Sequence, residues 1–382
     1  MKIRLFQITL FLVFVFLNNL HVTADAMIIP APPKIKASSY LVMDFNSGNL
    51  LVEENIDQRL PPASLTKIMT VYVVASELAN GKISLDDEVL VSEKAWRTQG
   101  SRMFIEVDKK VKLDDLLHGV IIQSGNDASV ALAEYVSGTE AVFADIMNKH
   151  AERLGMKDTH FVNSTGLPDP NHYTTASDLA KLARALIRDF PEVYELHKIK
   201  EFSFNKIKQH NRNKLLWRDR SVDGIKTGHT EAAGYCLVAS AVRDGMRLVS
   251  VVMGSDGMNA RAKASQALLN YGYRFYETHK LYSAGDLITS VKVWKADIDT
   301  VNLCIEKDLY ITVSRGQYDK LEPIVEIDKQ VVAQVNQGEQ KGVLNIMLQN
   351  KNIISVPLLA MESVSEGGIV NRLKDEVRLL FD

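Results

Sequence analysis

The strongest structural signal in the chain is residues 235–253, YCLVASAVRDGMRLVSVVM. Two apolar runs, Tyr235–Val242 and Met246–Met253, flank the dipeptide Asp244-Gly245. An Asp-Gly pair favours a two-residue hairpin turn, because both positions of that turn need a positive φ. The stretch therefore predicts a tight antiparallel β-hairpin.

Helical periodicity surrounds this hairpin on both sides. It predicts helices over 61–80, 113–122, 127–136, 140–154, 176–188 and 259–276. A second hairpin is expected at Ser39–Glu53, with its turn at Asn46-Ser47-Gly48-Asn49. Strands mixed with helices, without the regular alternation of a parallel sheet, indicate an α+β fold in which helices cover an antiparallel sheet.

The composition changes near Ser283-Ala284-Gly285, and helical periodicity disappears from there to about Met361. Short alternating runs replace it, at Ile288–Trp294, Leu309–Val313 and Ile353–Leu358. Such runs predict a small all-β domain. The polar stretch Ser363–Gly368 then indicates a linker, and a short amphipathic segment closes the chain.

The N-terminus has the pattern of a secretory signal peptide. Lys2 and Arg4 precede an apolar run over 5–17, and a small-x-small cleavage site follows at Ala24-Asp25-Ala26. The alternative is an uncleaved membrane helix, but the run is shorter than the ~20 residues that a span needs. We therefore expect four parts: a signal peptide at 1–26, a main domain at 27–284, an all-β domain at 285–362, and a linker with a C-terminal helix at 363–382.

The overall composition narrows the class of protein. The formal net charge of -2 over 382 residues gives no basic footprint for a nucleic-acid partner. The two cysteines, Cys236 and Cys304, fall in different predicted domains, so no disulfide is expected. The nine histidines show no metal-ligand spacing, which predicts chemistry without a metal or another cofactor.

Three short motifs contain the candidate catalytic residues. Two of them occur more than once, and the expected local structure indicates which copy can form a site. Ser-x-x-Lys occurs at Ser64–Lys67 and at Ser203–Lys206. The first pair begins a predicted helix, where residues i and i+3 share a face. The second lies in a stretch that alternates like a strand, where i and i+3 point to opposite faces. Only Lys67 is therefore expected to reach its serine.

The Ser-x-Asn motif also occurs more than once. Ser47-Gly48-Asn49 is explained by turn chemistry alone. Ser124-Gly125-Asn126 interrupts two predicted helices, where its side chains can project into a cleft, although helix capping is an alternative role. The third motif, Lys226-Thr227-Gly228, occurs once.

The order SxxK, SxN and KTG resembles that of penicillin-binding proteins and serine β-lactamases. Three further stretches are similar to the low-molecular-mass D-alanyl-D-alanine carboxypeptidases (peptidase S11-like), and they are Phe161–Leu167, Asn211–Trp217, and Lys226–Thr230 with Gly234-Tyr235. The resemblance covers nearly the whole mature chain. It implies a β-lactamase/transpeptidase-like sheet covered by helices, and an enzyme that removes the terminal D-alanine from peptidoglycan stem peptides. It also implies covalent inhibition by β-lactams.

The resemblance, together with the chemistry of the side chains, assigns a role to each motif residue. A serine hydroxyl needs a base, and Lys67 is placed to take the proton of Ser64 if burial and the cation Lys226 lower its pKa. The family implies that Ser124 takes part in proton transfer to the leaving group. The resemblance implies that the remaining residues bind substrate. Asn126 would hold the peptide backbone, and Lys226 and Thr227, of the motif Lys226-Thr227-Gly228, would bind the terminal carboxylate with the help of Arg261. The backbone N–H groups of Ser64 and His229 would bind the oxyanion. A solvated surface position is the alternative for Arg261.

Rival functions are a β-lactamase, an endopeptidase that cuts cross-links, and a non-catalytic wall-binding scaffold. A class A β-lactamase needs an acidic residue for deacylation, but no Glu lies between Glu152 and Glu192, and Asp169 sits in a Pro-Asp-Pro turn. We therefore expect β-lactams to acylate the enzyme and to leave slowly. The intact motif residues argue against the scaffold, and the endopeptidase stays open.

The C-terminal segment predicts contact with a membrane surface. Drawn as a helix, residues 369–382 place an apolar stripe on one side, made of Ile369, Val370, Leu373, Val377, Leu380 and Phe381. A helix of about four turns lies in the interface and does not span. With the signal peptide, this predicts an exported protein held peripherally on the periplasmic face of the inner membrane. The alternative is a terminal helix docked on the β domain.

Overall fold

The computed structural model describes residues 29–379, so the predicted signal peptide and residues 380–382 lie outside the described part. The chain divides into two compact units. Of the described residues, the first unit comprises Ala31–Ser283 and Lys307–Thr312, and the second comprises 29–30, Ala284–Glu306 and 313–379.

The first unit is built on a five-stranded antiparallel sheet, in the order β2-β1-β9-β8-β7. Its strands are β1 (Ser39–Asp44), β2 (Leu50–Glu54), β7 (Val222–Thr230), β8 (Gly234–Arg243) and β9 (Met246–Ser255). The predicted hairpin is confirmed: Arg243 pairs with Met246, and both intervening residues have a positive φ. The predicted α+β class is therefore confirmed.

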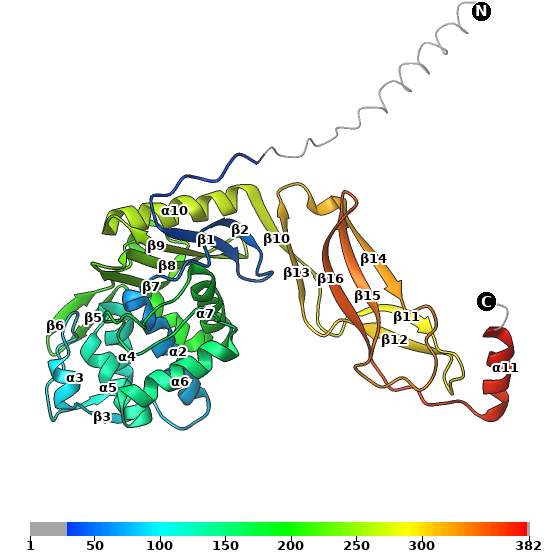
Figure 1. The fold of residues 1–382 in the computed structure, drawn as a ribbon, viewed down its shortest axis with the longest axis horizontal. Coiled ribbons are helices and arrows are strands. Elements are labelled where there is room, and N and C mark those ends of the chain that lie inside the picture. The colour runs from blue at the N-terminus through cyan, green and yellow to red at the C-terminus, as the bar shows by residue number, and fades with distance from the viewer. Residues whose placement is uncertain (1–28, 380–382) are drawn as a thin grey trace, which may run out of the picture. The chain divides into compact units, whose positions relative to one another are not determined.

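Helices cover both faces of this sheet (Figure 1). Helix α10 (Met258–Phe275) lies along one face, and α2 (Lys67–Ala79) and α7 (Ala176–Asp189) belong to the helical layer on the other. The other helices are α3 (Glu93–Arg97), α4 (Leu113–His118), α5 (Asn126–Ser137), α6 (Glu140–Arg153), α8 (Pro191–Tyr194) and α9 (Leu215–Arg218). The unit also contains two small two-stranded antiparallel sheets, β3 (Glu88–Leu90) with β4 (Lys110–Lys112) and β5 (Glu201–Phe204) with β6 (Ile207–His210).

The structure refines three of the predicted elements. The helix expected from Pro61 begins as a 3-10 turn over Ala63–Thr66, and α2 starts at Lys67. The helix expected over 113–122 ends in a π-helical turn, Gly119–Gln123, directly before Ser124. The Glu201–Lys208 stretch is a hairpin and not one continuous strand, because the chain turns at Asn205 and Lys206, which both have a positive φ.

The second unit contains a five-stranded sheet in the order β11-β12-β16-β15-β14, which confirms the predicted small all-β domain. Its strands are β11 (Leu287–Lys292), β12 (Thr300–Cys304), β14 (Leu321–Ile327), β15 (Gln340–Leu348) and β16 (Lys351–Ala360). The strand expected at 309–313 forms as β13 (Leu309–Ser314), but it pairs with β10 (Tyr276–Tyr282) and not with this sheet. The last element of the described part is α11 (Ile369–Leu379).

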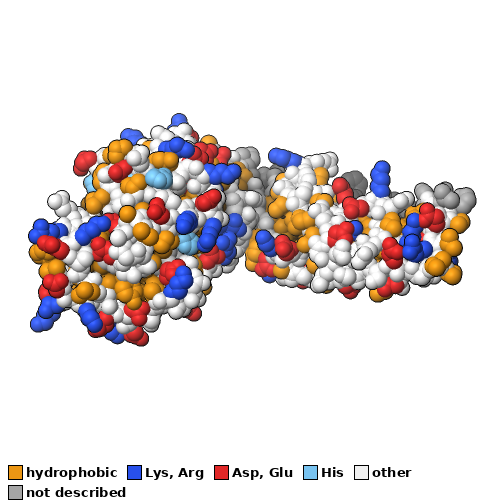
Figure 2. Space-filling model, turned by 60° about the horizontal axis from the view of Figure 1, so that its bottom comes forward, with side chains coloured by type: hydrophobic (Ala, Val, Ile, Leu, Met, Phe, Trp, Pro, Cys, Tyr) orange, Lys and Arg blue, Asp and Glu red, His pale blue; other side chains and the backbone are white. Residues whose placement is uncertain are grey.

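No helix within residues 29–379 combines the length and the apolarity needed to cross a bilayer. Over the face shown in Figure 2, Lys and Arg side chains are interspersed with Asp and Glu. Both cysteines are free, and Cys236 is buried in β8.

Candidate active site

The three motif segments meet at one cleft of about 680 Å³ in the first unit. The 3-10 turn before α2 provides Ser64 and the turn before α5 provides Ser124, while strand β7 and helix α10 also line the cleft. The residues that line it are Ser64, Gly100, Ser101, Ser124, Asn211, Arg212, Lys214, Thr227, Gly228, His229, Tyr235, Met258 and Arg261. None of these described lining residues is acidic.

Ser64 and Lys67 are in contact, as the i, i+3 spacing predicts. The Lys67 Nζ lies 3.2 Å from the Ser64 Oγ. The lysine side chain is fully buried, whereas the serine is only partly covered and lines the cleft. The pair thus joins an accessible hydroxyl to an amine that is shielded from water.

Two further bonds determine which way the amine faces. Lys67 Nζ donates to the Asn126 Oδ1 at 2.7 Å and to the Thr165 carbonyl at 2.6 Å. Both partners are acceptors only, so each requires an N–H. A neutral amine has two N–H bonds and one lone pair, and these two shorter contacts use both N–H bonds. The lone pair is then directed at Ser64, where it can accept the hydroxyl proton.

The surroundings make the neutral amine available near neutral pH. Burial, aided by the Arg212 guanidinium, lowers the pKa of Lys67 to about 7. The sequence points to Lys226 as the second cation, but Arg212 takes this place. The charge of Lys67 does affect Lys226: the pKa of Lys226 is lowered mainly by burial and secondly by repulsion from Lys67.

Ser124 and Lys226 form the second pair in the cleft. Lys226 Nζ donates to the Ser124 Oγ at 2.9 Å and to the Thr227 carbonyl at 3.0 Å. Ser124 has a φ of 65°, a left-handed conformation that is uncommon for a residue with a side chain. This conformation occurs where the π-helical turn ends, and there the hydroxyl lies within hydrogen-bond reach of β7.

Asn126 bridges the two sides of this turn. Its Oδ1 accepts from Lys67, and its Nδ2 donates to the Gln99 carbonyl at 2.6 Å. The next residue, Asp127, is a site residue that the motifs do not predict. Its buried carboxylate accepts from the backbone N–H groups of Met103, Phe104 and Ile105, which ties the 101–105 segment to the start of α5. Its position next to the Ser-x-Asn motif was the available signal.

Strand β7 carries Thr227, Gly228 and His229 along the cleft. It is an edge strand, bonded to β8 on one side only. Gly228 lies close to the segment that precedes Ser64, since a Cβ there would lie 3.0 Å from the Pro62 carbonyl. The His229 ring stacks on Tyr235 with centroids 3.9 Å apart.

Arg261 is 5% exposed, so it is not the solvated surface residue that the sequence left open. It extends from α10 and donates to the Gly228 carbonyl at 2.8 Å. Arg212 also lines the cleft, within the Asn211–Trp217 stretch, and burial lowers its pKa. The cleft is therefore lined by the basic side chains of Arg212, Lys214 and Arg261, with Lys226 bonded to Ser124, and it suits an anionic ligand.

The rejected motif copies lie elsewhere. Ser203 is an exposed residue of β5, and Lys206 lies in the following turn. Ser47 donates from its N–H and its Oγ to the Asp44 carboxylate, which is a turn interaction. Asp169 accepts from the Asn171 N–H in an exposed turn.

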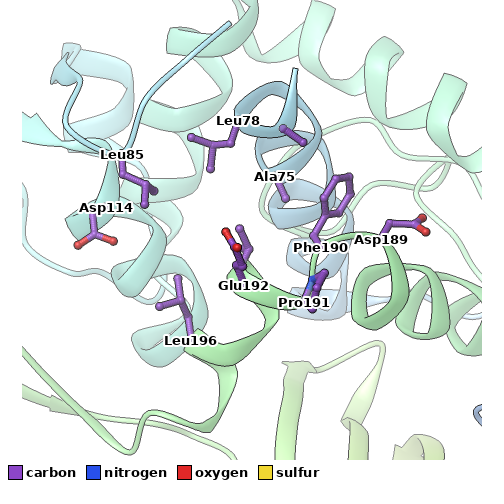
Figure 3. Close-up of a pocket in the computed structure, with 11 residues that line it drawn as sticks. Ala75, Leu78, Leu85, Asp114, Asp189, Phe190, Pro191, Glu192 and Leu196 are labelled. Atoms are coloured by element: carbon purple, nitrogen blue, oxygen red, sulfur yellow. The ribbon is translucent and has the colours of Figure 1, made fainter. Parts of the chain in front are cut away.

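A second hollow of about 420 Å³ is lined mainly by apolar side chains such as Leu78, Leu85, Phe190 and Leu196 (Figure 3). Asp114, Asp189 and Glu192 are its acidic members. Its described lining includes no motif residue and no basic residue. The candidate chemistry therefore belongs to the first cleft.

Comparison with known proteins identifies two matching families. Residues 26–257 match the family described as D-alanyl-D-alanine carboxypeptidase, and residues 276–366 match the C-terminal domain of penicillin-binding protein 5. The D-alanyl-D-alanine carboxypeptidase DacC of Escherichia coli is 44% identical over 91% of this chain and 89% of its own length.

Solved structures show the same relationship. Penicillin-binding protein 5 from Haemophilus influenzae matches with a TM-score of 0.86 and 44% identity, over 88% of this chain and all of the other. Penicillin-binding protein D2 from Listeria monocytogenes, solved with bound ampicillin, matches with a TM-score of 0.59 and 30% identity, over 64% of this chain and all of the other.

Proposed function

The chain belongs to the D-alanyl-D-alanine carboxypeptidase family and is an enzyme of that activity, and we propose that it hydrolyses peptidoglycan pentapeptide stems through an acyl intermediate on Ser64. The observation that carries this proposal is the Ser64–Lys67 contact at 3.2 Å, with both N–H bonds of the neutral amine used elsewhere. This arrangement suits nucleophilic catalysis by a serine without a histidine.

In acylation, Lys67 takes the Ser64 proton as the Oγ attacks the carbonyl carbon of the penultimate D-alanine. The resulting oxyanion is bound by the backbone N–H groups of Ser64 and His229. When the C–N bond breaks, a proton must reach the leaving amine, and Ser124, bonded to Lys226, is the donor on that side. The Lys226 ammonium then reprotonates Ser124. Free D-alanine leaves, and water attacks the ester and passes its proton through Ser124 to Lys226, while protonated Lys67 returns its proton to the Ser64 Oγ.

Substrate recognition follows from the edge position of β7. A peptide that lies along a free strand edge gains main-chain hydrogen bonds. Its terminal carboxylate would then meet Lys226 and Thr227, and Arg261 supports the Gly228 carbonyl of the same strand. Asn126 is proposed to contact the peptide backbone once substrate displaces one of its present bonds.

The same site is proposed to react with β-lactams, and the relative that was solved with bound ampicillin supports this. The absence of an acidic side chain among the described lining residues supports slow release of the adduct. Intact-mass spectrometry after exposure to benzylpenicillin should show one long-lived adduct, mapped to Ser64. Rapid turnover of nitrocefin would instead identify a β-lactamase.

The substrate itself is tested with a pentapeptide stem and with a cross-linked dimer. We expect free D-alanine from the pentapeptide and little cleavage of the dimer. Cleavage of the dimer without release of D-alanine would support an endopeptidase and contradict this proposal.

Acylation should depend on pH with the pKa of the base. Because protonated Lys67 cannot accept the serine proton, the acylation rate should rise about tenfold per pH unit below pH 7 and level off above it. Stopped-flow acylation with a fluorescent penicillin between pH 5.5 and 9 measures this profile. A rate that is flat through pH 7, or that falls as the pH rises, would contradict base catalysis by Lys67.

Lys226 should be the residue that recognises the terminal carboxylate of the substrate. We expect amidation of this carboxylate to reduce kcat/KM strongly in the wild type and much less in Lys226→Ala, since the variant has already lost the interaction. Steady-state release of D-alanine or D-alaninamide from the paired substrates provides the comparison. Equal losses in both proteins would assign recognition of the carboxylate to another residue.

We also propose that α11 holds the protein at a membrane surface. Ile369, Val370, Leu373 and Val377 are all more than half exposed, and some hydrophobic side chains gather at the end of the molecule where α11 lies (Figure 2). The polar side of the helix faces the β unit, because the Asp375 carboxylate accepts from the Lys295 N–H at 2.8 Å and Glu376 pairs with the Lys295 ammonium. The docked helix thus turns its apolar side outward, as an interfacial helix requires.

Truncation after Glu366 should leave carboxypeptidase activity unchanged and move the protein from the membrane pellet to the soluble fraction. Leu373→Glu should weaken binding to liposomes, whereas the matched control Asn371→Glu adds the same charge on the other side of α11 and should have little effect. Sedimentation with liposomes compares them. A truncated protein that still pellets, or that melts several degrees lower, would make α11 a structural element.

Together with the N-terminal pattern, this gives a proposed location and domain arrangement. Residues 1–26 would direct export and be removed, 27–284 would form the catalytic domain, 285–362 the β domain, and 363–382 the linker and anchor. The enzyme would then act on the periplasmic face of the inner membrane, beside its peptidoglycan substrate. N-terminal sequencing of the exported protein tests the cleavage site, which we expect before Met27.

A further inference from the structure

The residue before the nucleophile has a strained backbone. Ala63 has a φ of 48°, a left-handed conformation that costs energy for a residue with a Cβ. Its carbonyl is enclosed by Gly166, where a Cβ would lie 1.8 Å from the Ala63 oxygen. Strained conformations persist only where the surrounding structure holds them, so the contacts of this carbonyl matter for the position of Ser64.

A short chain of hydrogen bonds reaches this carbonyl from a buried histidine. The Thr66 Oγ1 donates to the Ala63 oxygen at 2.8 Å, and it also lies 2.8 Å from the His172 Nε2. The hydroxyl has one hydrogen, which the carbonyl takes, so Nε2 must be the donor to Thr66. The Val162 N–H donates to the His172 Nδ1 at 3.4 Å, which requires the same tautomer.

The environment keeps His172 in this single form. The residue is 3% exposed, and its ring packs edge-on against Phe161. Burial lowers the pKa of His172 to about 4, so the ring is neutral at the pH where the enzyme works. A neutral ring with a protonated Nε2 gives the chain of bonds one fixed direction, from His172 through Thr66 to Ala63.

The same loop also holds the base. The Thr165 carbonyl accepts from Lys67, the Gly166 backbone encloses the Ala63 carbonyl, and His172 bonds Thr66. One loop therefore contacts three of the five residues from Ala63 to Lys67. It fixes the backbone on both sides of Ser64 without touching the serine hydroxyl.

We propose that His172 is a positioning residue for the nucleophile, acting through Thr66 on the strained Ala63 carbonyl so that the Oγ and the backbone N–H of Ser64 face the substrate carbonyl. This inference rests on the proposed role of Ser64 as the nucleophile. His172 touches neither substrate nor Ser64, so its loss should slow the chemical step and leave reversible binding of penicillin unchanged.

The test compares acylation by a fluorescent penicillin in matched variants, with the rate of acylation and the reversible dissociation constant separated by stopped flow. His172→Leu and Thr66→Val each break the chain and should slow acylation by about tenfold to a hundredfold, as a misplacement of reacting atoms by about 1 Å does. The double variant should be no slower than the worse single variant, because both changes break one chain. His172→Gln keeps an N–H donor and should stay within about threefold of the wild type.

His160→Leu is the matched control. His160 also bonds a backbone carbonyl of the same loop, that of Asn171 at 2.7 Å, but it has no bond to Thr66. The His160→Leu variant should have a lower melting temperature than the wild type but the same rate of acylation. If His172→Leu does not fold, Thr66→Val and His172→Gln test the same chain.

Three results would overturn the inference. The first is acylation of Thr66→Val at the wild-type rate, and the second is a double variant that loses acylation rate by the product of the two single losses. The third is a His160→Leu variant that is acylated as slowly as His172→Leu. A wild-type enzyme that takes no adduct on Ser64 would instead contradict the proposed function.

Discussion

Ser64→Ala is expected to take up no benzylpenicillin and to release no D-alanine, while the protein remains folded. The substitution removes the hydroxyl that we propose forms the acyl ester, so the loss should be complete and not partial. Ser64 is partly exposed in the cleft, and its Oγ contacts the Lys67 amine. Loss of that contact removes no large buried group, so melting should change little.

Ser203→Ala is the matched control, because Ser203 begins the other Ser-x-x-Lys sequence of the chain. It should be acylated at the wild-type rate, since β5 and the following turn leave Ser203 exposed and away from the cleft. Intact-mass spectrometry and peptide mapping measure both variants. An adduct on Ser203 or Ser124 in the wild type would disprove the assignment of the nucleophile.

Lys67→Arg is expected to be nearly inactive although it retains the positive charge. A guanidinium does not lose its proton in a protein, so it cannot accept the serine proton as a lysine with a pKa of about 7 can. The Thr165 carbonyl and the Asn126 Oδ1 remain as acceptors for its N–H groups. The variant therefore separates the loss of the base from the loss of the charge.

The rate of acylation by a fluorescent penicillin, measured beside a melting curve, tests this expectation. Lys206→Arg makes the same change in the other Ser-x-x-Lys sequence, Ser203–Lys206, and should not change the rate of acylation. Acylation of Lys67→Arg within about tenfold of the wild-type rate, only about 1.4 kcal/mol in the barrier, would refute base catalysis by Lys67.

Local patterns account for the parts of the fold that were predicted. The β8–β9 hairpin was predictable because Asp244-Gly245 can adopt the positive φ values of a two-residue turn, and both do. The Ser64–Lys67 contact was predictable because i and i+3 share a helical face, and the 3-10 turn at Ala63–Thr66 preserves that proximity. Such signals depend on a few neighbouring residues and need no knowledge of the rest of the chain.

Strand partners were less predictable than strands. The alternating pattern of β13 marks a strand correctly, but nothing in it distinguishes β10 from the strands of the β sheet as its partner. Backbone hydrogen bonds are the same for every residue type, so the pairing of distant segments depends on how whole elements pack.

The sequence by itself determined the motif set, its order and the class of chemistry, since these reside in side-chain types and local spacing. Only the tertiary structure decided what lowers the pKa of Lys67 and orients its amine: burial, the Arg212 charge, and two acceptors from segments far along the chain. One acceptor is the backbone carbonyl of Thr165, a group that every residue has. The sequence therefore does not show which backbone carbonyl will contact the amine, because that depends on the tertiary structure.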